Sequence, residues 1–136
     1  MESNLNNQQA LKSHRDLRVW KASMDFVQDV YRITTRFPRT EQMALTSQMR
    51  RSAVSVPSNI AEGWSRNSAA GFSYFLRIAS GSMSELMTQV EIAYRINYIS
   101  GDKMNELESK GDEISRMLFA LTKKVESRDK TVKTNK

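Results

Sequence analysis

Apolar residues recur along this chain at steps of three and four, which is the spacing of one face of a helix. One such run extends from Leu17 to Thr34, and similar runs follow later in the chain. β-branched residues do not alternate with polar ones in any stretch, so no strands are expected. Breaks at Pro38, at 63–68 and at 100–102 divide the chain into helical segments at about 15–37, 40–63, 68–99 and 102–127. The pattern predicts an all-α protein, a four-helix bundle over residues 15–127.

The first segment carries two apolar stripes. One consists of Leu17, Trp20, Met24, Val27 and Tyr31, and the other of Val19, Phe26, Val30, Ile33 and Phe37. At 100° per residue the stripes are adjacent and cover about 200° of the helix, although a bundle core needs only a little over 100°. The surplus predicts contact with another subunit. We assign Val19, Phe26, Val30 and Ile33 to that oligomer interface.

The third segment repeats this arrangement. Its main stripe contains Phe72, Phe75, Ala79, Met83, Leu86, Val90 and Ala93. A second stripe, on a different side, contains Tyr74, Ile78, Ile92 and Ile96, which we also assign to the oligomer interface. The fourth segment has a single regular seam from Met104 to Val125. Two long helices with double stripes indicate a bundle inside an oligomer, and the alternative is a monomer with one wide core.

The second segment has a proline, Pro57, inside its apolar stripe. Proline lacks an amide hydrogen and clashes with the preceding turn, so a kink or break is expected there. Ser55, Ser58, Asn59 and Glu62 surround it and can satisfy the freed backbone groups. No base lies nearby in sequence, so this polar cluster is interpreted as structural rather than catalytic.

Few residues are available for chemistry. The 136-residue chain has no cysteine and a single histidine, His14. This excludes thiolate metal ligands and leaves no second histidine for a metal site or an acid/base pair. No glycine-rich phosphate loop is present. We expect no catalytic residues, no metal, no cofactor and no enzymatic activity.

The N-terminal residues 1–14 are polar and predict a flexible segment. They resemble neither a signal peptide nor a membrane anchor. No run of about 18 apolar residues occurs anywhere, so no membrane-spanning helix is expected. A cytoplasmic protein without a membrane partner is the expectation.

Positive charge is concentrated in two regions. The chain has 21 Lys and Arg against 15 Asp and Glu, a net charge of +6, and the excess lies in 12–66 and 123–136. Such asymmetry favours a polyanionic partner. The candidate nucleic-acid-binding residues are the basic side chains of these regions: Arg18, Lys21, Arg32, Arg36, Arg50, Arg51, Arg66, Lys123, Lys124 and Arg128.

Each of these cations also has a structural interpretation. Arginines can hold phosphate oxygens through forked hydrogen bonds. Asp25 and Asp29, however, can neutralise the first helix at helical spacing, and Arg50 or Arg51 can pair with an acid. Residues 128–136 are expected to form a basic disordered tail, which either binds phosphates or only aids solubility. Of the aromatic residues, Trp64 is expected to be exposed.

Several strings of residues match a known family. They include Asp16-Leu17-Arg18-Val19-Trp20, Leu45-Thr46-Ser47-Gln48-Met49-Arg50-Arg51-Ser52-Ala53 and Ser55-Val56-Pro57-Ser58-Asn59-Ile60-Ala61-Glu62-Gly63. Over about residues 15–122 the chain resembles the four-helix-bundle family named for proteins encoded in 23S rRNA intervening sequences. The resemblance implies an antiparallel up-down bundle that assembles into a homopentameric ring. The family is also similar to the accessory proteins of diversity-generating retroelements, which are thought to bind nucleic acid and a reverse transcriptase.

Together these features give one preferred function and one rival. The preferred function is a non-enzymatic oligomeric accessory protein that binds RNA or DNA through its basic surface and docks a reverse transcriptase or an RNA-processing enzyme. The rival is a protein-binding scaffold ring that makes no contact with nucleic acid.

Overall fold

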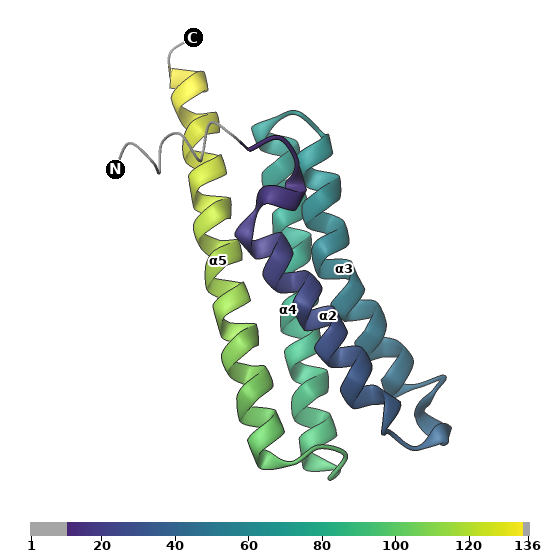
Figure 1. Ribbon diagram of the computed structural model, residues 1–136. Coiled ribbons are helices and arrows are strands. Elements are labelled where there is room, and N and C mark those ends of the chain that lie inside the picture. Colours follow the sequence, from purple (N-terminus) through teal and green to yellow (C-terminus); the bar gives the residue numbers. More distant parts are fainter. Residues whose placement is uncertain (1–10, 135–136) are drawn as a thin grey trace.

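The computed structural model describes residues 11–134, with side chains as far as residue 128. The described residues form four α-helices: α2 (Arg18–Thr35), α3 (Leu45–Ser65), α4 (Ala69–Arg95) and α5 (Gly101–Thr134). Two 3-10 turns accompany them, η1 (His14–Asp16) before α2 and η2 (Arg39–Glu41) before α3. Consecutive helices lie side by side and run in opposite directions (Figure 1). The predicted all-α, up-down four-helix bundle is confirmed, with no strand among the described residues.

The bundle is held by a continuous apolar core to which every helix contributes. The most deeply buried large side chains include Val30 on α2, Met49 and Ile60 on α3, Leu86 on α4 and Leu118 on α5. The contact between α3 and α4 is the most extensive, whereas α2 and α5 share the sparsest contact of the four neighbouring pairs. The bundle is therefore tight on its α3/α4 side and looser where α2 meets α5.

The second apolar stripe of α2 supplies its most deeply buried side chains, whereas the first stripe is only partly buried. Val19, Phe26 and Val30 are 4%, 2% and 0% exposed and lie in the core of the chain itself. Their assignment to an oligomer interface is wrong, because a side chain buried within its own chain cannot contact another subunit. Ile33 is half-buried and packs against the same core. On the other stripe, Met24 and Tyr31 are 38% and 41% exposed.

The interior proline does not break its helix. α3 is continuous from Leu45 to Ser65, with Pro57 buried inside it. The Asn59 side-chain amide donates to the Ser55 carbonyl oxygen at 2.8 Å and to the Ser55 hydroxyl at 2.9 Å. The Ser55 hydroxyl is also 2.8 Å from the hydroxyl of Ser82 on α4. Ser55 and Asn59 therefore form a structural link to α4, whereas Ser58 is exposed and Glu62 pairs with Arg66. The predicted break is absent.

The helix ends also differ from the predicted ones in detail. Ser68 caps α4, accepting from the Gly71 amide at 3.1 Å. The hydroxyl of Ser100 accepts from the Lys103 amide in the first turn of α5. Asn97, with φ 68°, takes the left-handed position after α4 that a glycine usually occupies. Gly63, predicted to begin a turn, is instead a buried residue within α3.

The last helix extends further toward the C-terminus than predicted. α5 continues to Thr134, seven residues beyond the predicted end at 127, so the backbone of 128–134 is helical and not disordered. At the other end, Leu11 packs against the core, and a capping box joins Ser13 and Asp16 around η1. Residues 1–10 of the predicted flexible segment, and 135–136 of the predicted tail, lie outside the described residues. No described helix is apolar and long enough to cross a membrane.

Candidate nucleic-acid interface

Arg50 on α3 is held in place by two residues of α2. Its Nε donates to the Thr34 hydroxyl at 2.9 Å, and Thr34 in turn donates to the Val30 carbonyl oxygen at 2.7 Å. The Arg50 guanidinium carbon also lies 4.5 Å from the centre of the Tyr31 ring. These contacts use Nε and one face of the guanidinium, and leave its two terminal amino groups available to a ligand. Arg50 is thus a half-buried cation fixed in one orientation.

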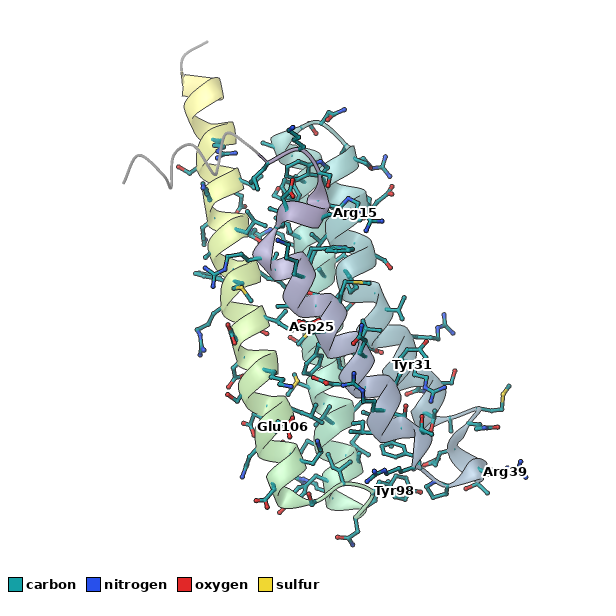
Figure 2. The ribbon with its side chains drawn as sticks, viewed as in Figure 1. Arg15, Asp25, Tyr31, Arg39, Tyr98 and Glu106 are labelled. Carbon is teal, nitrogen blue, oxygen red and sulfur yellow. The ribbon has the colours of Figure 1, made fainter. Side chains whose placement is uncertain are left out.

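An open groove of about 700 Å³ lies beside Arg50, between α2 and α3. Tyr31, labelled in Figure 2, stands on the α2 side that faces α3. The other lining residues come from the start of α3 and the loop before it: Gln42, Met43, Thr46, Ser47, Arg50, Arg51, Val54 and Ser55. The lining contains two arginines and several neutral hydrogen-bonding side chains, but no carboxylate. A groove of this composition is suited to an anion.

Arg51 contributes to the same groove in a different way. It is exposed and makes no hydrogen bond or salt bridge with the described residues. The predicted pairing of either arginine with Glu41 or Glu62 does not occur, since Arg50 bonds Thr34 and Glu62 pairs with Arg66. The two neighbouring arginines therefore combine one fixed guanidinium with one exposed side chain that has no partner among the described residues.

The outer face of α2 carries the other predicted cations of this region. Arg18, Lys21 and Arg36 are exposed and form no salt bridge within the described part of the chain. Arg32 is paired with Asp29 at 3.2 Å. The interpretation of this face as salt-bridged is thus correct for Arg32 alone, and three cations remain available.

Asp29 is itself shared with α5. Lys110 donates to it at 2.9 Å, and this hydrogen bond is the main reason why the pKa of Lys110 is raised above its ordinary value. With Arg32 and Lys110 both beside it, the Asp29 carboxylate is already neutralised. Asp25, labelled in Figure 2, is then the one acid left on the outer face of α2 that has no salt bridge among the described residues. The face has a net positive charge.

The remaining predicted cations lie away from the groove. Arg66 pairs with Glu62 at 2.5 Å, and its guanidinium carbon lies 4.8 Å from the centre of the Phe75 ring. Both contacts lie within the chain, so Arg66 fits the structural interpretation rather than the nucleic-acid-binding one. Lys123 lies 5.4 Å from the ring of Phe119 on α5. Lys124 and Arg128 are exposed on the same helix. The structure does not bring these residues of α3 and α5 together with Arg50 and Arg51 in one site.

Several residues of the groove were not identified from the sequence. Thr34 and Tyr31 fix Arg50 from a helix that is 16 residues away along the chain, and Thr46 and Gln42 line the groove.

Trp64, expected to be exposed, is half-buried and packs edge-on against Phe72 with ring centres 6.0 Å apart. The described residues contain no cluster of His, Asp or Glu able to hold a metal ion.

α4 carries a second surface of interest, which is exposed and apolar. Tyr74, Ile78, Ile92 and Ile96 are 61%, 37%, 43% and 45% exposed, whereas Ala79, Met83 and Leu86 of the main stripe are buried. The main stripe therefore faces the core as predicted. We call the four exposed residues the α4 stripe; no described element covers it.

The fold resembles a solved structure. That structure is of a protein with unknown function from the S23 ribosomal protein family of Bacteroides thetaiotaomicron VPI-5482. The TM-score is 0.71 and the sequence identity 24%, over 77% of this chain and 95% of that chain, which establishes the similarity of fold alone. A search of curated proteins found no match. Residues 15–120 match the family described as 23S rRNA-intervening sequence protein. The match spans well over half of the chain, which therefore belongs to the 23S rRNA-intervening sequence protein family.

Proposed function

We propose that this chain is a non-enzymatic cytoplasmic accessory protein that binds nucleic acid through phosphate contacts on α2 and in the α2/α3 groove. The observation that carries the proposal is the fixed Arg50 guanidinium, oriented by Thr34 and Tyr31 beside a groove that has no acidic lining residue. A guanidinium held in this way loses little conformational freedom when it binds a phosphate. A merely solubilising surface does not require an arginine anchored by two residues of another helix.

The outer face of α2 extends this basic surface. Arg18, Lys21 and Arg36 have no salt-bridge partner in the described residues, and Asp29 is neutralised by Arg32 and Lys110. Exposed cations of this kind position a nucleic acid without reading its sequence. The family description names an rRNA intervening sequence, so RNA is the nucleic acid that the test uses first.

Self-association is the second part of the proposal. The α4 stripe exposes four large apolar side chains that none of the described residues covers, and a surface of this kind favours a second copy or another protein. The resemblance to retroelement accessory proteins suggests a homopentamer. In such an assembly, five copies of the basic surface would act together. A reverse transcriptase or an RNA-processing enzyme is the proposed protein partner.

The test measures the affinity for a labelled structured RNA at 50 mM and at 200 mM salt. We expect tight binding at low salt that weakens steeply at high salt. The double variant Arg50→Gln, Arg51→Gln should lose most of this binding. Arg95→Gln, Arg116→Gln is the matched control, because it removes the same charge from exposed positions on α4 and α5. No binding at low salt, or binding indifferent to salt, would rule out the proposal.

The rival function is a protein-binding scaffold ring that never contacts nucleic acid. The exposed α4 stripe is the observation that favours it. Under this function, Arg50→Gln, Arg51→Gln would leave partner binding and cellular activity intact. Introducing a charge into the α4 stripe would abolish both.

A further inference from the structure

The N-terminus of α3 opens into the α2/α3 groove without a cap. The preceding residue, Ala44, has φ −127° and ψ −109° and offers no side-chain hydrogen bond. The amides of Leu45, Thr46 and Ser47 have no backbone acceptor among the described residues. The first amides of a helix carry a partial positive charge of about half an elementary charge, which attracts anions. Since Thr46 and Ser47 line the groove, this positive helix end adjoins Arg50 and Arg51.

Thr46 provides an independent sign of a ligand. Its side chain is only 5% exposed, and its hydroxyl oxygen is buried with no hydrogen-bond partner in the described part of the chain. A buried hydroxyl without a partner destabilises a fold, so native proteins rarely leave one unless it has another use. The residue lines the groove that Arg50 and Arg51 share. That oxygen has no exposed surface in this structure, so a ligand oxygen between Arg50 and the helix end would meet this hydroxyl after rotation of the Thr46 side chain.

The charge of the groove exceeds that of one internal phosphate. Two guanidinium groups and a helix N-terminus face no carboxylate in the lining. An internal phosphodiester has one negative charge, whereas a phosphate monoester has nearly two at neutral pH, because its second pKa is about 6. A monoester phosphate occurs only at a strand end. The volume of about 700 Å³ leaves room for the attached nucleotide as well.

We propose that the α2/α3 groove binds the terminal phosphate of a nucleic acid strand. Arg50 and Arg51 donate to the phosphate oxygens together with the first amides of α3, and the Thr46 hydroxyl donates to the same group. This inference rests on the proposed function and makes it more specific: the outer face of α2 holds the strand, and the groove recognises its end.

The experiment compares three single-stranded RNAs of one sequence, each carrying an internal fluorophore. One has a 5′-phosphate, one has a 3′-phosphate and one has hydroxyl groups at both ends. We expect a phosphorylated RNA to bind at least about tenfold more tightly than the hydroxyl RNA, since charge-assisted hydrogen bonds are strong. The end that gives the preference identifies the source of the phosphate. Equal affinity for all three RNAs would overturn the inference.

Thr46→Val is the decisive variant. It keeps the β-branched shape and removes only the unpartnered hydroxyl, so its melting temperature should equal or exceed that of the wild type. We expect most of the preference for a phosphorylated end to disappear in Thr46→Val and all of it in Arg50→Gln. Arg36→Gln is the matched control, because it removes one charge at the end of α2, outside the groove. It should lower the affinity for all three RNAs by the same factor. A Thr46→Val protein that retains the full preference would overturn the role of this hydroxyl.

Failure of the inference can be told apart from failure of the proposed function. If the three RNAs bind equally and all lose affinity at high salt, the surface binds nucleic acid but the groove does not recognise an end. If none of them binds at low salt, the proposed function fails together with the inference.

Discussion

Gly63 of α3 lies directly against Phe75 of α4. A Cβ atom added at Gly63 would stand 2.9 Å from the Cβ of Phe75, 3.0 Å from Cδ1 of Phe72 and 3.2 Å from the Phe72 carbonyl oxygen. Because two of these atoms belong to or adjoin the α4 backbone, they cannot move aside as the end of a flexible side chain can. The absence of a side chain at Gly63 is what allows the two helices to approach so closely at this end of the bundle.

Gly63→Ala should therefore destabilise the protein. Overpacking a close helix contact costs about 1–3 kcal/mol, whereas the better helix propensity of alanine returns about 1 kcal/mol. We expect a net loss of up to about 2 kcal/mol in the free energy of unfolding, measured by urea denaturation of dilute protein. Gly81→Ala is the matched control on α4, where an added Cβ meets nothing within 4 Å. It should be neutral or raise stability by up to about 1 kcal/mol. Equal effects of the two variants would contradict the close approach at Gly63.

Lys110→Met should weaken the sparse contact between α5 and α2. Lys110 donates to Asp29 at 2.9 Å and is partly exposed, so the loss at pH 7 should stay below about 1 kcal/mol. The Asp29 hydrogen bond raises the pKa of Lys110, so its stabilisation is fully present below the ordinary lysine value of 10.5 and declines as the pH rises through the raised value. The stability difference between wild type and variant should shrink in that alkaline range.

Lys103→Met is the control for this pair. Lys103 contacts Glu106 at 3.1 Å within α5 and makes no salt bridge to another helix among the described residues. Its replacement should change the free energy of unfolding less than Lys110→Met does. Comparable losses for the two variants would show that the interhelical bond to Asp29 adds nothing.

The fold class and three of the four core stripes could be predicted from the sequence, but the core face of α2 could not. Two apolar stripes run along α2, and periodicity alone does not distinguish which one faces inward. The buried stripe includes Ser23 and Thr34, two polar residues that appear to interrupt it. Their hydroxyls donate to the carbonyl oxygens of Val19 and Val30, four residues earlier, at 2.6 and 2.7 Å. Because these bonds are local, Ser and Thr are tolerated inside a core.

The candidate site was predictable only in part for a different reason. The pair Arg50-Arg51 is visible in the sequence, since these two adjacent arginines are the basic residues of α3. Their different roles depend on tertiary contacts with Thr34 and Tyr31 on α2. The groove likewise joins the loop after η2, the first half of α3 and Tyr31 of α2, so no local pattern could identify Thr46 as a lining residue.

Arg50→Lys should reduce RNA affinity although it preserves the charge. Lysine lacks the planar fork that bonds Thr34 through Nε and stacks on Tyr31, so it would reach the groove as a mobile point charge. We expect about a tenfold weaker binding in a fluorescence anisotropy titration, which corresponds to about 1.4 kcal/mol. Arg51→Lys is the matched control, because Arg51 has no fixed partner in the described residues, and it should bind nearly as the wild type does. If both lysine variants bound alike, the fixed orientation of Arg50 would have no part in binding.

Ile92→Asp should dissociate the proposed assembly without unfolding the chain. Ile92 lies beside Ile96 in the C-terminal part of the α4 stripe and is 43% exposed, so a carboxylate there remains solvated in a single chain. Within an apolar contact between copies, the same carboxylate would be buried without a partner, at a cost of several kcal/mol. Phe119→Asp is the matched control, since Phe119 is 64% exposed on α5, outside the stripe. Light scattering coupled to gel filtration should give a lower mass for Ile92→Asp and an unchanged mass for Phe119→Asp. A wild-type protein that already runs as a monomer, or an Ile92→Asp protein with the mass of the wild-type assembly, would exclude the α4 stripe as the self-association surface.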